Sequence, residues 1–74
     1  MKKPKYAYVS KFNSIGVIID RGTDSNGEEW FRTDSDGVRY SSELLFLYTK
    51  GDVIRCAKQL NARIAPSTKK LIGI

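Results

Sequence analysis

The first 48 residues consist of short runs of β-branched or aromatic residues separated by clusters of turn-forming residues. Aromatic side chains stand at alternate positions from Tyr6, a period that is typical of a strand with one face against a core. The next run, at residues 15–19, is rich in β-branched residues. Gly16 inside that run indicates a bulge or a close approach of another backbone segment. The pattern therefore predicts a meander of short antiparallel strands.

Two turns divide the middle of the chain. Residues 22–27 are small or polar and predict a hairpin loop, which leads into a strand at residues 29–33. Residues 34–37, Asp-Ser-Asp-Gly, predict a tight turn in which Gly37 takes a positive φ, with a returning strand at residues 38–40. Residues 42–50 allow two interpretations. Ser41, Ser42 and Glu43 either form one helical turn before a last strand or begin a helix, and the aromatic content favours the strand.

A helix is expected over residues 52–64, with Asp52 as its N-cap. Apolar residues recur there at helical spacing and form one stripe; they are Val53, Cys56, Ala57, Leu60 and Ile64. The tail at residues 65–74 is expected to be a closing strand or a frayed end. A competing arrangement resembles the second half of a helix-turn-helix, although Pro66 stands where that motif needs a compact turn.

Composition excludes several classes of site. The chain of 74 residues allows one domain, residues 1–74, and has no His, so the usual general base and the commonest neutral metal ligand are missing. A single Cys56 excludes an internal disulfide and fits a reducing, cytoplasmic location. No apolar run approaches the ~18 residues of a membrane span. We therefore expect no enzymatic activity, no catalytic residue, no metal, no cofactor and no membrane partner.

Charge is distributed in three blocks within a net charge of +5. Residues 1–11 carry four lysines and no acid, and the segment from residue 44 onward carries six cations and one acid. Between them, residues 20–43 hold seven acids and three arginines. Clustered positive charge raises the local concentration of phosphate groups, so this order predicts a polyanion as partner.

The first two thirds of the chain resemble a known class of small barrels. A Gly-Val-Ile strand (residues 16–20) is followed by a long loop, an aromatic strand (29–33), an Asp-Gly hairpin (36–40) and a Ser-Glu-Leu turn (42–44). This series over residues 6–48 is similar to SH3-like barrels of the Tudor and KOW type, and the turn-rich style is similar to that of small phage or bacterial proteins. The resemblance implies a module that binds RNA, DNA or peptides.

We therefore predict a mostly β (α+β) fold, a small antiparallel SH3-like barrel of about five strands with one C-terminal helix. The predicted function is that of a non-enzymatic basic module that binds DNA or RNA. Phosphate contacts are expected from basic residues outside the acidic middle, and base stacking from rings that arginines flank. The predicted contacts are Lys2, Lys3, Lys5, Arg55, Lys58, Lys69, Lys70, Trp30, Tyr40, Arg32 and Arg39.

Two points stay open in this prediction. Trp30 and Phe31 are neighbours on a strand and point to opposite faces. Either both rings pack in the core, or one fills the core and the outward ring stacks on a base or peptide. Tyr6 and Tyr8 would join the stacking surface if their strand lay beside that of Tyr40. The alternative function is a protein–protein interaction module, an adaptor or inhibitor, in which the acidic loops at residues 24–29 and 34–36 matter as much as the lysines.

Overall fold

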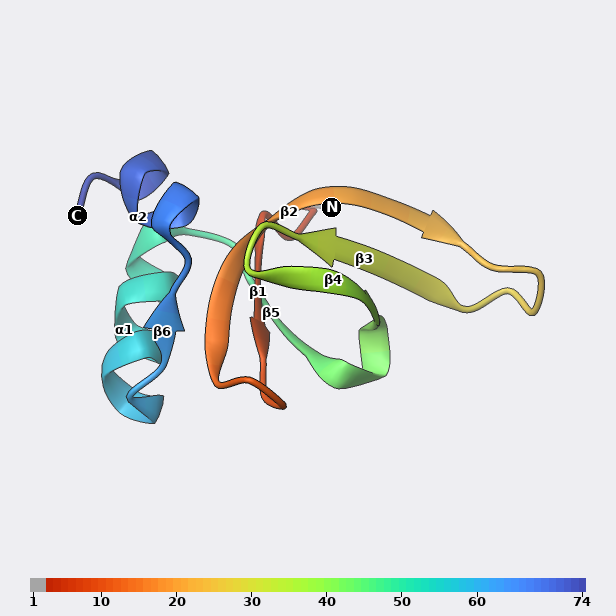
Figure 1. The fold of residues 1–74 in the computed structure, drawn as a ribbon, viewed down its shortest axis with the longest axis horizontal. Coiled ribbons are helices and arrows are strands. Elements are labelled where there is room, and N and C mark those ends of the chain that lie inside the picture. The colour runs from red at the N-terminus through yellow and green to blue at the C-terminus, as the bar shows by residue number, and fades with distance from the viewer. Residues whose placement is uncertain (1–2) are drawn as a thin grey trace.

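The computed structural model describes residues 3–74, without the side chain of Asp36. Six strands, two α-helices and one 3₁₀ turn follow one another along this part of the chain (Figure 1). Their bounds are β1 Tyr6–Val9, β2 Ser14–Thr23, β3 Glu29–Thr33, β4 Asp36–Tyr40, η1 Ser41–Glu43, β5 Leu44–Leu47, α1 Lys50–Leu60, β6 Arg63–Ile64 and α2 Pro66–Ile72.

Five antiparallel strands form one curled sheet in the order β4-β3-β2-β1-β5. The long strand β2 pairs with β1 through its first half and with β3 through its second half. The register shifts between Ile18 and Asp20, and such a bulge bends a strand, which lets β2 belong to both halves of the sheet. The result is a half-barrel compatible with an SH3-like fold (Figure 1), which confirms the predicted fold class.

Two apolar layers lie on opposite faces of the β1–β2–β5 sheet. Ala7 and Val9 are buried on the concave side, where the rings of Phe31 and Phe46 meet edge to face at 4.9 Å between centroids. Tyr6 points the other way, as the pleat of a strand requires. It belongs to a second cluster that joins the sheet to the helices, formed by Tyr6, Ile15, Leu47, Val53, Cys56, Ile64 and Ile72.

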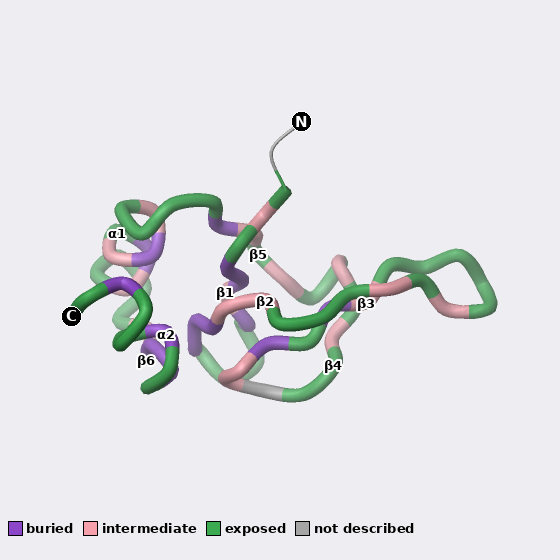
Figure 2. Tube along the Cα trace, turned by 90° about the horizontal axis from the view of Figure 1, so that it is seen from above, coloured by how far each residue is buried: buried purple, intermediate pink, exposed green. Residues whose placement is uncertain are grey.

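The helices therefore cover the outer face of this sheet (Figures 1 and 2). Val53 and Cys56 of α1 are buried there, as predicted. Leu60 is 44% exposed, so its predicted place in the core is wrong. The helix is shorter than residues 52–64 because it ends at Asn61, whose φ of 51° is left-handed. Ile64 is buried, but it lies on β6 rather than on the helix.

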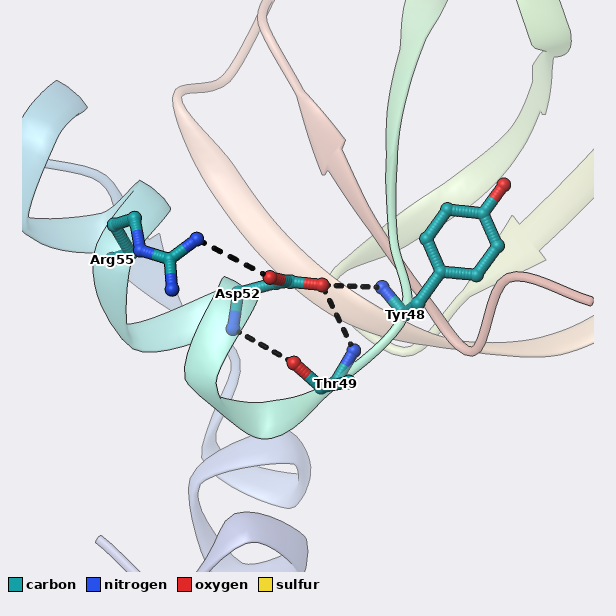
Figure 3. Close-up of polar contacts among 4 residues, drawn as sticks. All are labelled: Tyr48, Thr49, Asp52 and Arg55. Carbon is teal, nitrogen blue, oxygen red and sulfur yellow. Dashed lines mark hydrogen bonds and ion pairs between the residues drawn. The ribbon is translucent and has the colours of Figure 1, made fainter. Parts of the chain in front are cut away.

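α1 begins at Lys50, two residues before the expected start, and its first turn is a capping box (Figure 3). Thr49 is the N-cap, and its hydroxyl accepts a hydrogen bond from the Asp52 N–H at 3.1 Å. In return, Asp52 Oδ2 accepts the N–H groups of Thr49 at 3.2 Å and Tyr48 at 3.3 Å. The prediction of Asp52 as N-cap is wrong. Asp52 occupies position N3, and its carboxylate accepts a hydrogen bond from the backbone N–H of the N-cap residue.

The segment before α1 follows the strand interpretation. Residues 41–43 form the single turn η1 and β5 follows directly. The turn between β3 and β4, in contrast, is Asp34–Ser35, because Thr33 pairs with Asp36. Gly37 therefore lies inside β4, and the glycines with positive φ are Gly27 and Gly73. The turn lies in the first half of the predicted segment 34–37, and the predicted positive φ at Gly37 is wrong.

The tail is the helix α2 rather than a closing strand or a frayed end. Pro66 occupies its first turn and Gly73 ends it with a φ of 81°. Before it, β6 pairs in parallel with the start of β2, so α1 and α2 are separated by a strand and are not consecutive helices of a helix-turn-helix. Within residues 3–74, no helix is long and apolar enough to cross a membrane.

Candidate functional site

A cavity of about 350 Å³ opens where three segments meet. They are the β1–β2 turn, the β3–β4 turn and the junction of β6 with α2. Its volume lies at the lower end of the range of small-molecule pockets, about 300–1000 Å³. The lining residues are Phe12, Ser14, Asp34, Ser35, Arg63, Ala65 and Pro66.

Asp34 fixes one wall of the cavity. Its Oδ1 accepts the Val17 N–H at 2.8 Å, and the Thr68 hydroxyl lies 3.0 Å from Oδ1 and 2.9 Å from Oδ2. Thr68 is fully buried on α2, so this carboxylate joins the β3–β4 turn to the C-terminal helix. A Cβ at Gly16 would lie 2.6 Å from Asp34 Oδ1 and 2.6 Å from Ser35 Oγ. A close approach at Gly16 is thus present as predicted, but side chains of the β3–β4 turn make it rather than backbone atoms.

Asn13 fixes the β1–β2 turn, whose neighbouring residues Phe12 and Ser14 line the cavity. It has a φ of 50° in the β1–β2 turn, and its Oδ1 accepts the Tyr8 hydroxyl at 2.7 Å. Its Nδ2 donates to the Asn61 carbonyl at 3.0 Å, which ties the turn to the end of α1. The Arg63 N–H donates to the Asn13 carbonyl at 2.9 Å. The turn is therefore held at both ends, and it presents Phe12 beside the cavity.

Phe12 is 51% exposed and lies among cations. The Arg39 guanidinium carbon lies 5.0 Å from the ring centroid, and the Lys11 ammonium lies 5.8 Å from it. Both distances are within the range of cation–π attraction. Arg63 lines the same cavity and has no ion pair among the described residues. The Phe12 ring, which lines the cavity, thus has two cations beside it, and Arg63 adds a third cation to the cavity lining.

The floor of the cavity contains a buried hydroxyl group, that of Ser14, which has no hydrogen-bond partner among the described residues. Ser14 is 7% exposed. The neighbouring Ser35 Oγ lies 3.1 Å from Thr33 Oγ1 and is satisfied there. Buried hydroxyl groups in folded proteins are normally hydrogen-bonded, so Ser14 is the exception that requires an explanation.

The predicted stacking residues lie elsewhere. Register pairs Trp30 with Tyr40, and Arg32 shares their face, which is the outer face of β3 and β4. Arg32 forms an ion pair with Asp20 at 3.7 Å. A hydrogen bond to Asp24 raises the pKa of Tyr40, and the charges of Asp24, Glu28 and Glu43 add to this effect. The structure therefore brings these three predicted residues together, in acidic surroundings.

Arg39 is separated from them. It pairs with Phe31 across β3 and β4, so it lies on the concave face and reaches Phe12 there. The buried Phe31 and half-buried Trp30 confirm that these neighbours point to opposite faces. Tyr6 is buried under the helices, and β1 does not adjoin β4. The idea that Tyr6 and Tyr8 join Tyr40 in one stacking surface is therefore wrong.

The predicted lysines and the remaining arginine are spread over three elements. Lys69 and Lys70 are exposed on α2, three and four residues after Pro66, and so share the face of the residue that lines the cavity. Arg55 and Lys58 are exposed on α1, where Arg55 pairs with Asp52 at 3.5 Å. Exposed predicted residues also precede β1; they are Lys3 and Lys5. Lys2 lies outside the described residues.

Four residues of the cavity region were missed by the sequence pattern: Lys11, Phe12, Ser14 and Arg63. The Lys11–Phe12 pair beside a turn is a usable signal, because a large ring next to a turn is seldom fully buried. Ser14 and Arg63 carry no local signal, since they meet only when β6 pairs with β2.

The described residues contain no group of three His, Cys, Asp or Glu side chains placed to hold a metal ion. Cys56 is buried under the sheet, and desolvation raises the pKa of its thiol, which disfavours the reactive thiolate. The chain matches no model of a protein family, no curated protein and no solved structure with which it was compared.

Proposed function

We propose that this protein is a small, non-enzymatic, cytoplasmic module that binds nucleic acid, in the manner of Tudor- or KOW-type barrels. One observation carries the proposal: the exposed Phe12 ring lines a cavity, with Lys11 and Arg39 beside the ring and Arg63 in the same lining. Aromatic rings stack on bases and neighbouring cations neutralise phosphates, which is the combination that nucleic-acid surfaces use.

Two exposed aromatic surfaces, that of Trp30 and Tyr40 and that of Phe12, could stack on a base, and the charges around them favour Phe12. Trp30 and Tyr40 lie among acids, which repel a phosphate backbone. Phe12 lies among cations, and α2 extends that basic surface through Lys69 and Lys70. The proposal therefore centres on Phe12, with α2 as the next phosphate contact. The other predicted lysines and arginines would add to the positive field, and stacking on Trp30 or Tyr40 would be secondary.

Salt dependence tests this proposal. Affinity for a mixed-sequence oligonucleotide, measured by fluorescence anisotropy, is expected to fall steeply with salt, by a slope of roughly −0.7 to −0.9 in log K against log salt for each neutralised phosphate. Lys11→Ala should reduce that slope by about one phosphate. Lys69→Ala with Lys70→Ala should reduce it further.

Lys50→Ala is the matched control, because Lys50 is an exposed lysine at the start of α1, away from the cavity. It should leave the slope close to that of the unmodified protein. Equal effects of Lys11→Ala and Lys50→Ala would show that net charge alone binds the oligonucleotide. No binding of DNA or RNA at low ionic strength would reject the proposal.

A second candidate function rests on a different surface. β5 is the edge strand of the sheet, and a groove of about 440 Å³ lies between it and α1. Leu45 is 52% exposed and lines that groove together with the exposed Leu60. An edge strand beside an apolar groove can take up an extended peptide. Loss of a captured protein partner on Leu45→Asp, with unchanged nucleic-acid binding, would support this alternative.

A further inference from the structure

The floor and the exposed side of the cavity differ in chemistry. On the exposed side are the Phe12 ring and Arg63, which line the cavity, and Lys11 beside the Phe12 ring; these groups suit a planar ring and an anion. The floor holds the Ser14 hydroxyl, which is buried and has no hydrogen-bond partner among the described residues. Burying a hydroxyl without a partner costs free energy, and a ligand that reaches the floor would recover it.

Asp34 adds an acceptor to this floor. A carboxylate has about four lone-pair sites. The Val17 N–H is directed at Oδ1, and the single hydroxyl hydrogen of Thr68 lies within reach of both oxygens, slightly closer to Oδ2. These two donors fill only part of the acceptor capacity of the carboxylate. A negatively charged acceptor attracts an N–H group and repels a phosphate. The floor therefore selects a ligand with N–H donors, and the anionic part of that ligand stays near Arg63 and Lys11.

We propose that the cavity binds one unpaired base with an exocyclic amino group, and that the protein therefore prefers single strands. This inference rests on the proposed function. The base stacks on Phe12, its amino group donates to Asp34, and the Ser14 hydroxyl bonds the adjacent ring nitrogen or carbonyl. The sugar–phosphate chain lies along Arg63, Lys11 and the α2 lysines. In a duplex this base edge is already paired and stacked, so the base is available only in a single strand.

Cytosine and thymine provide the sharpest comparison. Both are pyrimidines, but cytosine presents an amino donor where thymine presents a carbonyl acceptor. The Asp34 carboxylate can accept a hydrogen bond from the amino group of cytosine, whereas it repels the carbonyl oxygen of thymine. We therefore expect an oligodeoxycytidine to bind more tightly than an oligothymidine of the same length, by about 10- to 150-fold for one hydrogen bond to a charged group.

The experiment measures both oligonucleotides and a mixed-sequence duplex against the full chain and its Ser14→Ala variant by fluorescence anisotropy. The variant should lose about 2- to 10-fold in affinity for oligodeoxycytidine and little for oligothymidine. Its thermal unfolding midpoint should be equal or higher, because the removed hydroxyl has no partner to lose. Ser25→Ala, in the exposed β2–β3 loop, is the matched control and should change neither.

A second measurement needs no variant. Deoxycytidine monophosphate titrated into the unmodified protein should shift the amide resonances of Ser14, Ser35 and Ala65 in NMR spectra, and thymidine monophosphate should shift them less. Equal affinity for the two oligonucleotides, or a cytosine preference that Ser14→Ala leaves intact, would overturn the base pocket while nucleic-acid binding stands. Tighter binding of the duplex would also overturn it. Binding of no oligonucleotide at low salt would reject the proposed function itself.

Discussion

The absence of a side chain at Gly16 determines how closely the β3–β4 turn approaches β2. Asp34 and Ser35 occupy the space that a Cβ would need. This contact brings Asp34 within reach of the Val17 N–H and of Thr68. The geometry of the cavity wall therefore depends on a glycine that contributes no atom to the cavity itself.

Gly16→Ala is expected to destabilise the protein by about 1–3 kcal/mol, because the new methyl group displaces the turn or bends β2. Chemical denaturation monitored by circular dichroism gives the free energy of unfolding. Gly37→Ala is the matched control, since a Cβ there meets nothing within 4 Å and Gly37 has no positive φ. It should be neutral or slightly stabilising. Equal losses at both positions would contradict the close approach at Gly16.

At the scale of an element, α1 depends on its first turn. Asp52 is held by the N–H groups of Thr49 and Tyr48, and Arg55 lies 3.5 Å from its other oxygen (Figure 3). The backbone hydrogen bond from Thr49 is the largest cause that lowers the pKa of Asp52 below its ordinary value, followed by that from Tyr48. The folded state therefore binds a proton at this group less readily than the unfolded chain.

This shift predicts how stability depends on pH. Because the folded pKa is lower, the contribution of Asp52 is present at neutral pH and is lost as the pH falls below about 4. Asp52→Asn should lower stability at pH 7 and make the acid side of the stability profile shallower. Thermal unfolding between pH 7 and pH 3 measures both effects. An acid side as steep in the variant as in the unmodified protein would contradict the assigned role.

At the scale of the whole molecule, a single hydroxyl connects the barrel to its C-terminal helix. Thr68 on α2 is fully buried and donates to Asp34, while its oxygen lies 2.9 Å from the Val17 N–H. Three segments, β2, the β3–β4 turn and α2, thus share one buried polar contact. The cavity lies beside this contact, so its shape follows the position of α2.

Thr68→Val is expected to cost about 1–3 kcal/mol, because it keeps the side-chain volume and leaves the half-buried Asp34 carboxylate without its hydroxyl donor. Thr23→Val, at the exposed end of β2, is the matched control and should stay within about 0.5 kcal/mol. Hydrogen exchange should show faster exchange in α2 and at Val17 of the Thr68 variant. Unchanged protection at Val17 would contradict the connection.

Much of the half-barrel is determined by local sequence. The period of two from Tyr6, the β-branched run of β2 and the single turn at residues 41–43 are patterns within a few residues, and the structure has them where expected. Helix and turn boundaries are less well determined. The shift of the β3–β4 turn to Asp34–Ser35 and of the N-cap to Thr49 shows that several nearby polar residues can serve as caps and turns, and pairing selects among them.

Tertiary structure alone decides the candidate site. Residues 13–15 and 63–65 carry no pattern that links them, yet backbone hydrogen bonds from Arg63 and Ala65 join them and create β6. That pairing ends the apolar stripe of α1 before Ile64, leaves Leu60 exposed, and brings Arg63 beside Phe12 and Ser14. Composition and spacing show which apolar residues a chain can bury and which charged residues it carries. The partners that those groups meet depend on contacts between distant segments, which form only when the whole chain folds.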